Sequence, residues 1–319
     1  MNNKTSAIRT GRRHLITALK LVVLFLLLWF VGNSLYRSIL LVDRTALSLR
    51  VELLALGSFV FVGACATGIL VFKRAYIILG SKLSWAQGFI LLTIPPMGKY
   101  LPNKFLSLVG HAMLAKSFGV QIKVSSVGAI LIMGLGLASA TLLGIFLLLV
   151  TPGYGSDVED IRIYPLLILL LPMIVFLHPK IFLYILNRML RIFNQSPIEI
   201  NLSLTQMIML FFILLVQNGL YISGVSVMAF GSVAAPAAAL PTVIGACCLA
   251  NVVGFLALFA PAGIGVREGV LLMILNQPLS AGTAGILVVM MRLVQTAADF
   301  VLSGIGYAVL FYLRRRNDV

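Results

Sequence analysis

The residues of this sequence that are best suited to chemistry interrupt two long apolar stretches. The first interruption runs from Pro95 to Lys104 and the second from Ala260 to Gly269. Each combines proline and glycine with basic side chains. Hydrocarbon does not tolerate irregular backbone exposed to lipid, so such breaks must line a cavity or lie inside protein. One charged break in each half of a very hydrophobic chain is typical of the binding site of a membrane transporter.

The first break carries residues that favour an anion. Lys99 and Tyr100 lie within it, and a proline then suits the first position of a new helix. The free N–H groups near Asn103 and Lys104 would present the positive end of that helix to an anion. Lys104 and His111 are seven residues apart, so both project from one helix face. We predict that these five residues bind an anionic head group; the alternative is that the lysines extend to the membrane interface.

The second break has a glycine-rich backbone followed by two charges. Gly263 and Gly265 permit backbone angles that other residues avoid, so consecutive N–H groups there would form an anion-binding nest. Arg267 follows in the first turn of the next helix and is predicted to join them in binding the head group. Glu268 points about 100° away from Arg267 on a helix, so the two charges do not simply neutralise each other. A carboxylate at membrane depth indicates a functional residue; the alternative is that Glu268 only complements the dipole at the start of the helix.

Further polar residues lie in the apolar segments of the second half. Arg292 and Asp299 are seven residues apart on one face of the last helix, which predicts either a structural salt bridge or part of a proton or ion relay. We assign this pair, with Glu268 and Asn251, to gating or coupling. For Asn251, Gln217 and Asn218, which are the other polar residues at membrane depth, the alternative is an ordinary hydrogen bond between helices.

Composition places the chain among polytopic membrane proteins. It has 319 residues, of which 61% are hydrophobic and 10% are charged, and its mean hydropathy is +1.08. No polar stretch is long enough for a soluble catalytic domain. The net charge of +15 fits cytoplasmic loops beside anionic lipids rather than nucleic-acid binding, because no basic domain stands outside the membrane.

Cysteine and histidine usage gives no sign of a cofactor or a metal. Cys65, Cys247 and Cys248 all lie in apolar segments without disulfide or metal spacing. No paired acids or Ser/His/Asp set typical of an intramembrane catalyst is evident. We therefore predict no catalytic residues, no metal and no cofactor, and a protein that is not an enzyme.

Hydropathy predicts an all-α bundle of about six full membrane spans and two re-entrant hairpins. A spanning helix needs about 20 apolar residues. The two broken regions are each too long for one helix and are interrupted near the middle; an eight-span bundle is the alternative. The predicted spans are Leu15–Tyr36, Val51–Phe72, Ser125–Val150, Ile163–His178, Thr205–Phe230 and Gly282–Leu313, and the broken regions are Trp85–Lys116 and Leu240–Asn276.

Charge distribution then predicts the topology of a single membrane domain over residues 1–319. Basic residues place the amino terminus and Arg314–Arg316 in the cytoplasm, and the acidic loop 157–160 outside. With this assignment residues 15–150 and 163–313 have the same order of elements in opposite orientations, which is an inverted repeat. Pro179–Phe193 is predicted to be an amphipathic helix at the membrane interface.

The two breaks and their flanks resemble the flippase-like membrane domain of lysylphosphatidylglycerol synthases, which has many stand-alone relatives. The resemblance covers nearly the whole chain and is carried by Leu249–Phe255, Ala260–Gly269 and Gly98–Lys104. Asn103 replaces the glycine usual in this first-half motif. His111 stands where relatives often carry arginine, and an acidic residue common in the next helix is missing around 129–136.

This resemblance implies translocation of a lipid with an anionic or amino-acylated head group. It does not imply lysyl transfer, because the aminoacyltransferase domain of the synthases is not in this sequence. We expect a multi-pass protein of the inner cell membrane that moves a phosphate-bearing lipid between leaflets. An isoprenoid-linked lipid would also meet this description. Two alternatives stay open: a non-transporting partner of a glycosyltransferase or envelope-assembly complex, and an intramembrane transferase for lipid-linked substrates. The oligomeric state is also left open.

Overall fold

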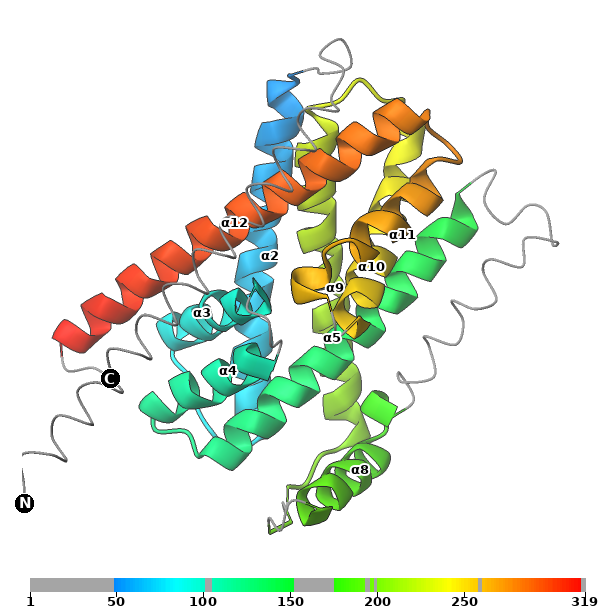
Figure 1. Cartoon of the computed structure of the whole chain (residues 1–319). Coiled ribbons are helices and arrows are strands. Elements are labelled where there is room, and N and C mark those ends of the chain that lie inside the picture. Colours follow the sequence, from blue (N-terminus) through cyan, green and yellow to red (C-terminus); the bar gives the residue numbers. More distant parts are fainter. Residues whose placement is uncertain are drawn as a thin grey trace, which may run out of the picture.

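The computed structural model describes residues 49–100, 105–151, 175–192, 196–197, 200–257 and 260–316, and this part of the chain is all-helical (Figure 1). The predicted span Leu15–Tyr36, nearly all of Ile163–His178 and the acidic loop 157–160 lie outside the described residues. So do Asn103 and Lys104 of the first break.

Five described segments are long and apolar enough to cross a membrane, as expected of a multi-pass membrane protein. Four of them coincide with spans predicted from hydropathy, and the fifth belongs to the second broken region. The segments are α2 (Val51–Ile78), α5 (Ile122–Val150), α9 (Leu204–Phe230), the segment Ala237–Leu256 that contains η4 (Ala237–Ala239) and α10 (Leu240–Leu256), and α12 (Ala281–Arg315).

The described part of the first broken region contains two short helices, α3 (Trp85–Thr93) and α4 (Phe105–Ser117), with the 3-10 helix η2 (Pro95–Tyr100) between them in the chain. The Ser84 hydroxyl and the Gln87 side chain cap the start of α3 reciprocally. At 1.5 Å per residue, the 9 residues of α3 and the 13 of α4 reach about 14 and about 20 Å. Neither crosses about 30 Å of hydrocarbon, as a re-entrant hairpin requires.

The two arms of the second broken region differ in length, although a break near its middle predicted arms of similar length. Its first arm, α10, is a candidate span when η4 is included, whereas its second arm, α11 (Val266–Leu275), has 10 residues. Between them the chain turns through η5 (Pro261–Gly263) with positive φ at Ala262 and at Gly263. Left-handed backbone at Ala262 costs about 1–2 kcal/mol, so surrounding contacts must hold this turn in place.

The helices α2 and α9 pack against each other along most of their length (Figure 1). In addition, α10 packs on α5, and α12 packs on α3, α9 and α11. The close approach of α2 and α9 depends on small residues. A Cβ built on Gly224 would lie 2.9 Å from the backbone oxygen of Gly57 and 3.0 Å from the backbone nitrogen of Phe61.

We therefore expect Gly224→Ala to lower the free energy of unfolding by about 1–3 kcal/mol, because backbone atoms cannot move aside as a side chain can. Gly219→Ala on the same helix is the matched control, since its Cβ would meet only Leu143 Cδ2 at 3.6 Å. That control gains helix propensity of up to about 1 kcal/mol. The measurement is the unfolding midpoint of each purified variant in detergent. Equal midpoints for the two variants would contradict this packing.

Helix α8 (Pro179–Ile192) is amphipathic, as predicted. Phe182 and Leu186 are buried against the bundle, whereas Lys180 and Arg188 are exposed. Its exposed basic residues suit a position beside lipid head groups.

Candidate functional site

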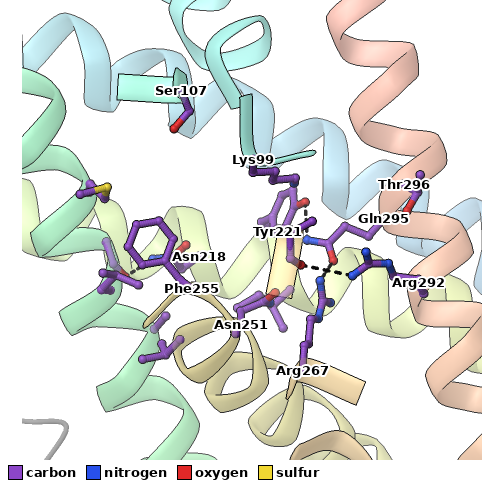
Figure 2. Close-up of a pocket in the computed structure, with 18 of the residues that line it drawn as sticks. Lys99, Ser107, Asn218, Tyr221, Asn251, Phe255, Arg267, Arg292, Gln295 and Thr296 are labelled. Atoms are coloured by element: carbon purple, nitrogen blue, oxygen red, sulfur yellow. Dashed lines mark hydrogen bonds between the residues drawn. The ribbon is translucent and has the colours of Figure 1, made fainter. Parts of the chain in front are cut away.

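A cavity of about 290 Å³ lies where the two breaks meet α5, α9 and α12. Figure 2 shows side chains from all these elements converging on it. One wall is apolar and comes largely from α5. The polar lining residues are Lys99, Tyr100, Ser107, Asn218, Tyr221, Asn251, Arg267, Arg292, Gln295 and Thr296.

Arg267 is the most buried cation of this cavity, with 6% of its surface exposed. In Figure 2 it extends from α11 toward Gln295 on α12. Its Nη1 donates a hydrogen bond to Gln295 Oε1, and its Nη2 lies 3.6 Å from Cys247 Sγ. The Gln295 amide nitrogen in turn donates to Tyr221 Oη at 3.1 Å. Among the described residues, the bonding partners of Arg267 are thus all neutral. A buried arginine with neutral partners is well suited to an incoming anion.

Arg292 is the second guanidinium of the cavity, and Glu268 neutralises it. Glu268 Oε1 lies 3.2 Å from Arg292 Nη1, and Glu268 Oε2 accepts a hydrogen bond of 2.7 Å from the backbone N–H of Gly265. Gly265 is the N-cap of α11 and has φ +84°, a conformation that favours glycine. Arg292 Nη1 also lies 3.4 Å from the carbonyl oxygen of Ala262. Glu268 therefore holds the second break in place. It also accepts the hydrogen bond of the Gly265 N–H, which was predicted to bind the ligand.

Asp299 makes the equivalent contact with the first break. Its Oδ2 lies 2.5 Å from Lys99 Nζ and accepts a hydrogen bond of 2.6 Å from the Tyr100 hydroxyl. Among the described residues, one ion pair therefore joins each break to α12. The prediction of a salt bridge between Arg292 and Asp299 is wrong, because each pairs with another residue. Seven residues span about 10 Å along a helix, so each side chain meets a different break instead.

The structure places His111 away from the cavity lining. The imidazole is 5% exposed, its Nε2 lies 2.7 Å from the Tyr76 hydroxyl, and its ring stacks on Phe72. The Tyr76 hydroxyl also lies 3.1 Å from Ser125 Oγ. These contacts join α4 to α2 and α5. The spacing from Lys104 identifies a helix face but does not show which neighbour that face meets.

The remaining predicted residues divide between lining and shaping the cavity. Asn251 lines it, whereas Gly263 packs against α10, where its Cβ would lie 3.0 Å from Gly254 Cα. Asn218, which also lines the cavity, donates from its amide to the Gly136 carbonyl at 2.9 Å and to Ser139 Oγ at 2.7 Å. These are hydrogen bonds between helices, the alternative predicted for such amides.

Sequence reasoning missed Tyr221, Gln295 and Thr296. A signal for two of them was present on the last helix. Gln295 is three residues after Arg292, and Thr296 is three before Asp299. Together the four residues form a polar stripe at helical spacing.

Within the described ranges, no three His, Cys, Asp or Glu side chains form a group suited to a metal ion. Comparison with known proteins adds no family to this picture: no family model matches the chain, and no curated protein sequence matches it. The likeness of the two breaks to the flippase-like domain of lysylphosphatidylglycerol synthases therefore stays a prediction from their residues.

Proposed function

We propose that this protein binds the anionic head group of a lipid in the cavity between the two breaks and moves that lipid between the leaflets of the inner cell membrane. The observation that carries the proposal is Arg267, a buried guanidinium that lines the cavity and is bonded to neutral groups. Buried charge is costly without an opposite charge. An anion in this cavity would supply it.

The balance of charge around the cavity favours one anionic group. Lys99 is paired with Asp299, and Arg292 with Glu268. Among the cations that the structure describes here, this leaves the charge of Arg267 for the ligand. The Tyr221 hydroxyl and the Asn251 amide line the same space and can donate hydrogen bonds to phosphate oxygens. A phosphate ester matches both the charge and the donors.

An inverted repeat would give such a site its means of alternating access. In this proposal α2 to α5 correspond to α9 to α12, and the two breaks correspond to each other. The helix contacts support the correspondence: α10 packs on α5 as α3 packs on α12, and α4 packs on α5 as α11 packs on α12. The matching pairs α2 with α3 and α9 with α10 are also in contact. We propose that the ion pairs of Asp299 and Glu268 hold the two breaks and release them in turn.

The test is lipid scrambling in liposomes that contain the purified protein. Head-group-labelled phosphatidylglycerol, a polyprenyl phosphate and an amino-acylated phospholipid are compared with zwitterionic phosphatidylcholine. We expect at least one anionic or amino-acylated lipid to move about tenfold faster than in protein-free vesicles, a change of about 1.4 kcal/mol in barrier. Absence of movement across the panel would overturn the proposal. It would favour a non-transporting partner of a glycosyltransferase or envelope-assembly complex.

A further inference from the structure

Gln295 links two of the donors that line the first cavity, Arg267 and Tyr221 (Figure 2). It lies on α12 and is 7% exposed. A guanidinium has donors only, so the amide oxygen of Gln295 must be the atom that faces Arg267. The amide nitrogen is then left to face Tyr221, and it donates a hydrogen bond of 3.1 Å to the tyrosine oxygen. Arg267 therefore sets the direction of both hydrogen bonds.

The direction of these bonds decides what the Tyr221 hydroxyl can do. Its oxygen accepts from Gln295, so its own proton must point elsewhere. A second cavity, of about 190 Å³, also meets this tyrosine, but the carboxylate that lines it, Asp299, already pairs with Lys99. A phosphate oxygen in the first cavity would therefore be the strongest acceptor for the tyrosine proton.

A neutral side chain at position 295 also keeps the charge of Arg267 available. Glutamate has nearly the same shape as glutamine and can accept hydrogen bonds from both Arg267 and Tyr221. It would, however, neutralise the guanidinium and take up the tyrosine proton, because a carboxylate only accepts. Gln295 instead holds both side chains in place and leaves the positive charge and the proton for a ligand.

We infer that Gln295 makes this cavity selective for anions, because it positions Arg267 without neutralising it and commits Tyr221 to donate to the ligand. This inference rests on the proposed function and adds to it a positioning residue and the direction of a ligand contact. The ligand group that it specifies is an ionised phosphate, whose oxygens accept hydrogen bonds. A lipid head group and free phosphate share this chemistry, so the experiment includes both.

The test compares two replacements that a structural role and a positioning role rank in opposite orders. Glutamate can keep both contacts of Gln295, whereas methionine, of similar length, can keep neither. We expect Gln295→Met to weaken binding about threefold, because the charge of Arg267 remains. We expect Gln295→Glu to weaken it at least about tenfold, because that charge is neutralised. The unfolding midpoint of Gln295→Glu should nevertheless be no lower than that of Gln295→Met.

The affinities are measured with radiolabelled dodecyl phosphate and with radiolabelled inorganic phosphate, on full-length protein in maltoside detergent. Gel filtration first shows that each variant is folded. Tyr221→Phe removes only the hydroxyl and should weaken binding about tenfold, as expected for a hydrogen bond to a charged group. Gln206→Glu is the matched control, because Gln206 and Ser203 cap the start of α9 reciprocally and glutamate also suits that position. It should leave the affinity unchanged.

The outcomes separate this inference from the proposed function. If Gln295→Met binds more weakly than Gln295→Glu, or Tyr221→Phe binds as well as the unmodified protein, the inference is overturned. Binding that still depends on Arg267 would then leave the proposed anion site standing. Binding that does not depend on Arg267 overturns the anion site itself.

The two probes distinguish the sources of the phosphate. Binding of inorganic phosphate alone, with the expected order of variants, supports the role of Gln295 and overturns a lipid as the ligand. Binding of dodecyl phosphate with that order supports both. If neither probe binds to the unmodified protein, the inference and the anion site are both overturned.

Discussion

Arg267→Gln is expected to abolish lipid movement while the protein still assembles in the membrane. Glutamine can keep a hydrogen bond toward Gln295 but has no charge for the head group. Truncating one member of a desolvated, hydrogen-bonded charge pair costs about 2–5 kcal/mol, which is at least about tenfold in affinity for the anion. The measurement is the scrambling rate of the best anionic substrate in vesicles with equal amounts of each protein.

Two comparisons show whether this loss comes from the buried charge. Arg267→Lys should recover part of the rate, because lysine restores the charge without the planar donors of arginine. Arg74→Gln removes an exposed arginine of α2 and should leave the rate unchanged. A normal rate for Arg267→Gln would contradict the central role of this residue in the proposed site.

Asp299→Asn is expected to destabilise the protein more than a double replacement that removes both charges of the pair. The single change leaves the Lys99 ammonium without its carboxylate and weakens the bond from Tyr100. Breaking a fully buried pair costs about 3–5 kcal/mol. Because the Lys99 side chain is 32% exposed, water can solvate part of its charge, and we expect about 2 kcal/mol.

The measurement is a double-mutant cycle with Lys99→Met, Asp299→Asn and the combined variant, in which the stability of each protein is read from its unfolding midpoint in detergent. The combined variant should be more stable than Asp299→Asn alone, because no uncompensated charge is left at the break. Strict additivity of the two single changes would show that Lys99 and Asp299 do not interact.

Hydropathy was sufficient to predict most of the described fold. The predicted spans that lie within α2, α5, α9 and α12 were found because a helix in hydrocarbon must be long and apolar. The ends of these helices were predicted less accurately than their centres. For example, α2 continues to Ile78, past the basic pair at Lys73 and Arg74. The second break was also harder to predict, because apolar composition does not reveal that its first arm, η4 together with α10, is long enough to cross.

The site was predictable in its residue types but not in its pairings. Lys99, Tyr100, Asn251, Arg267 and Arg292 all line one cavity, because breaks with charges must face a polar interior. Which cation meets which carboxylate depends on how α12 crosses the two breaks, and that is a tertiary contact. Spacing along one helix therefore misassigned the partner of Asp299. It also could not show that His111 packs on Phe72 and Tyr76.

The two ion pairs on α12 have opposite polarity, and this has an electrical consequence. The helix contributes the cation to one pair, at Arg292, and the anion to the other, at Asp299. If α12 shifts across the membrane, these two charges move together and cancel. The membrane potential acts with about 2.3 kcal/mol per elementary charge per 100 mV, so it would do almost no work on this pair of residues. If the proposed transport takes place, its voltage dependence would therefore report on Arg267 and the bound anion rather than on Arg292 and Asp299.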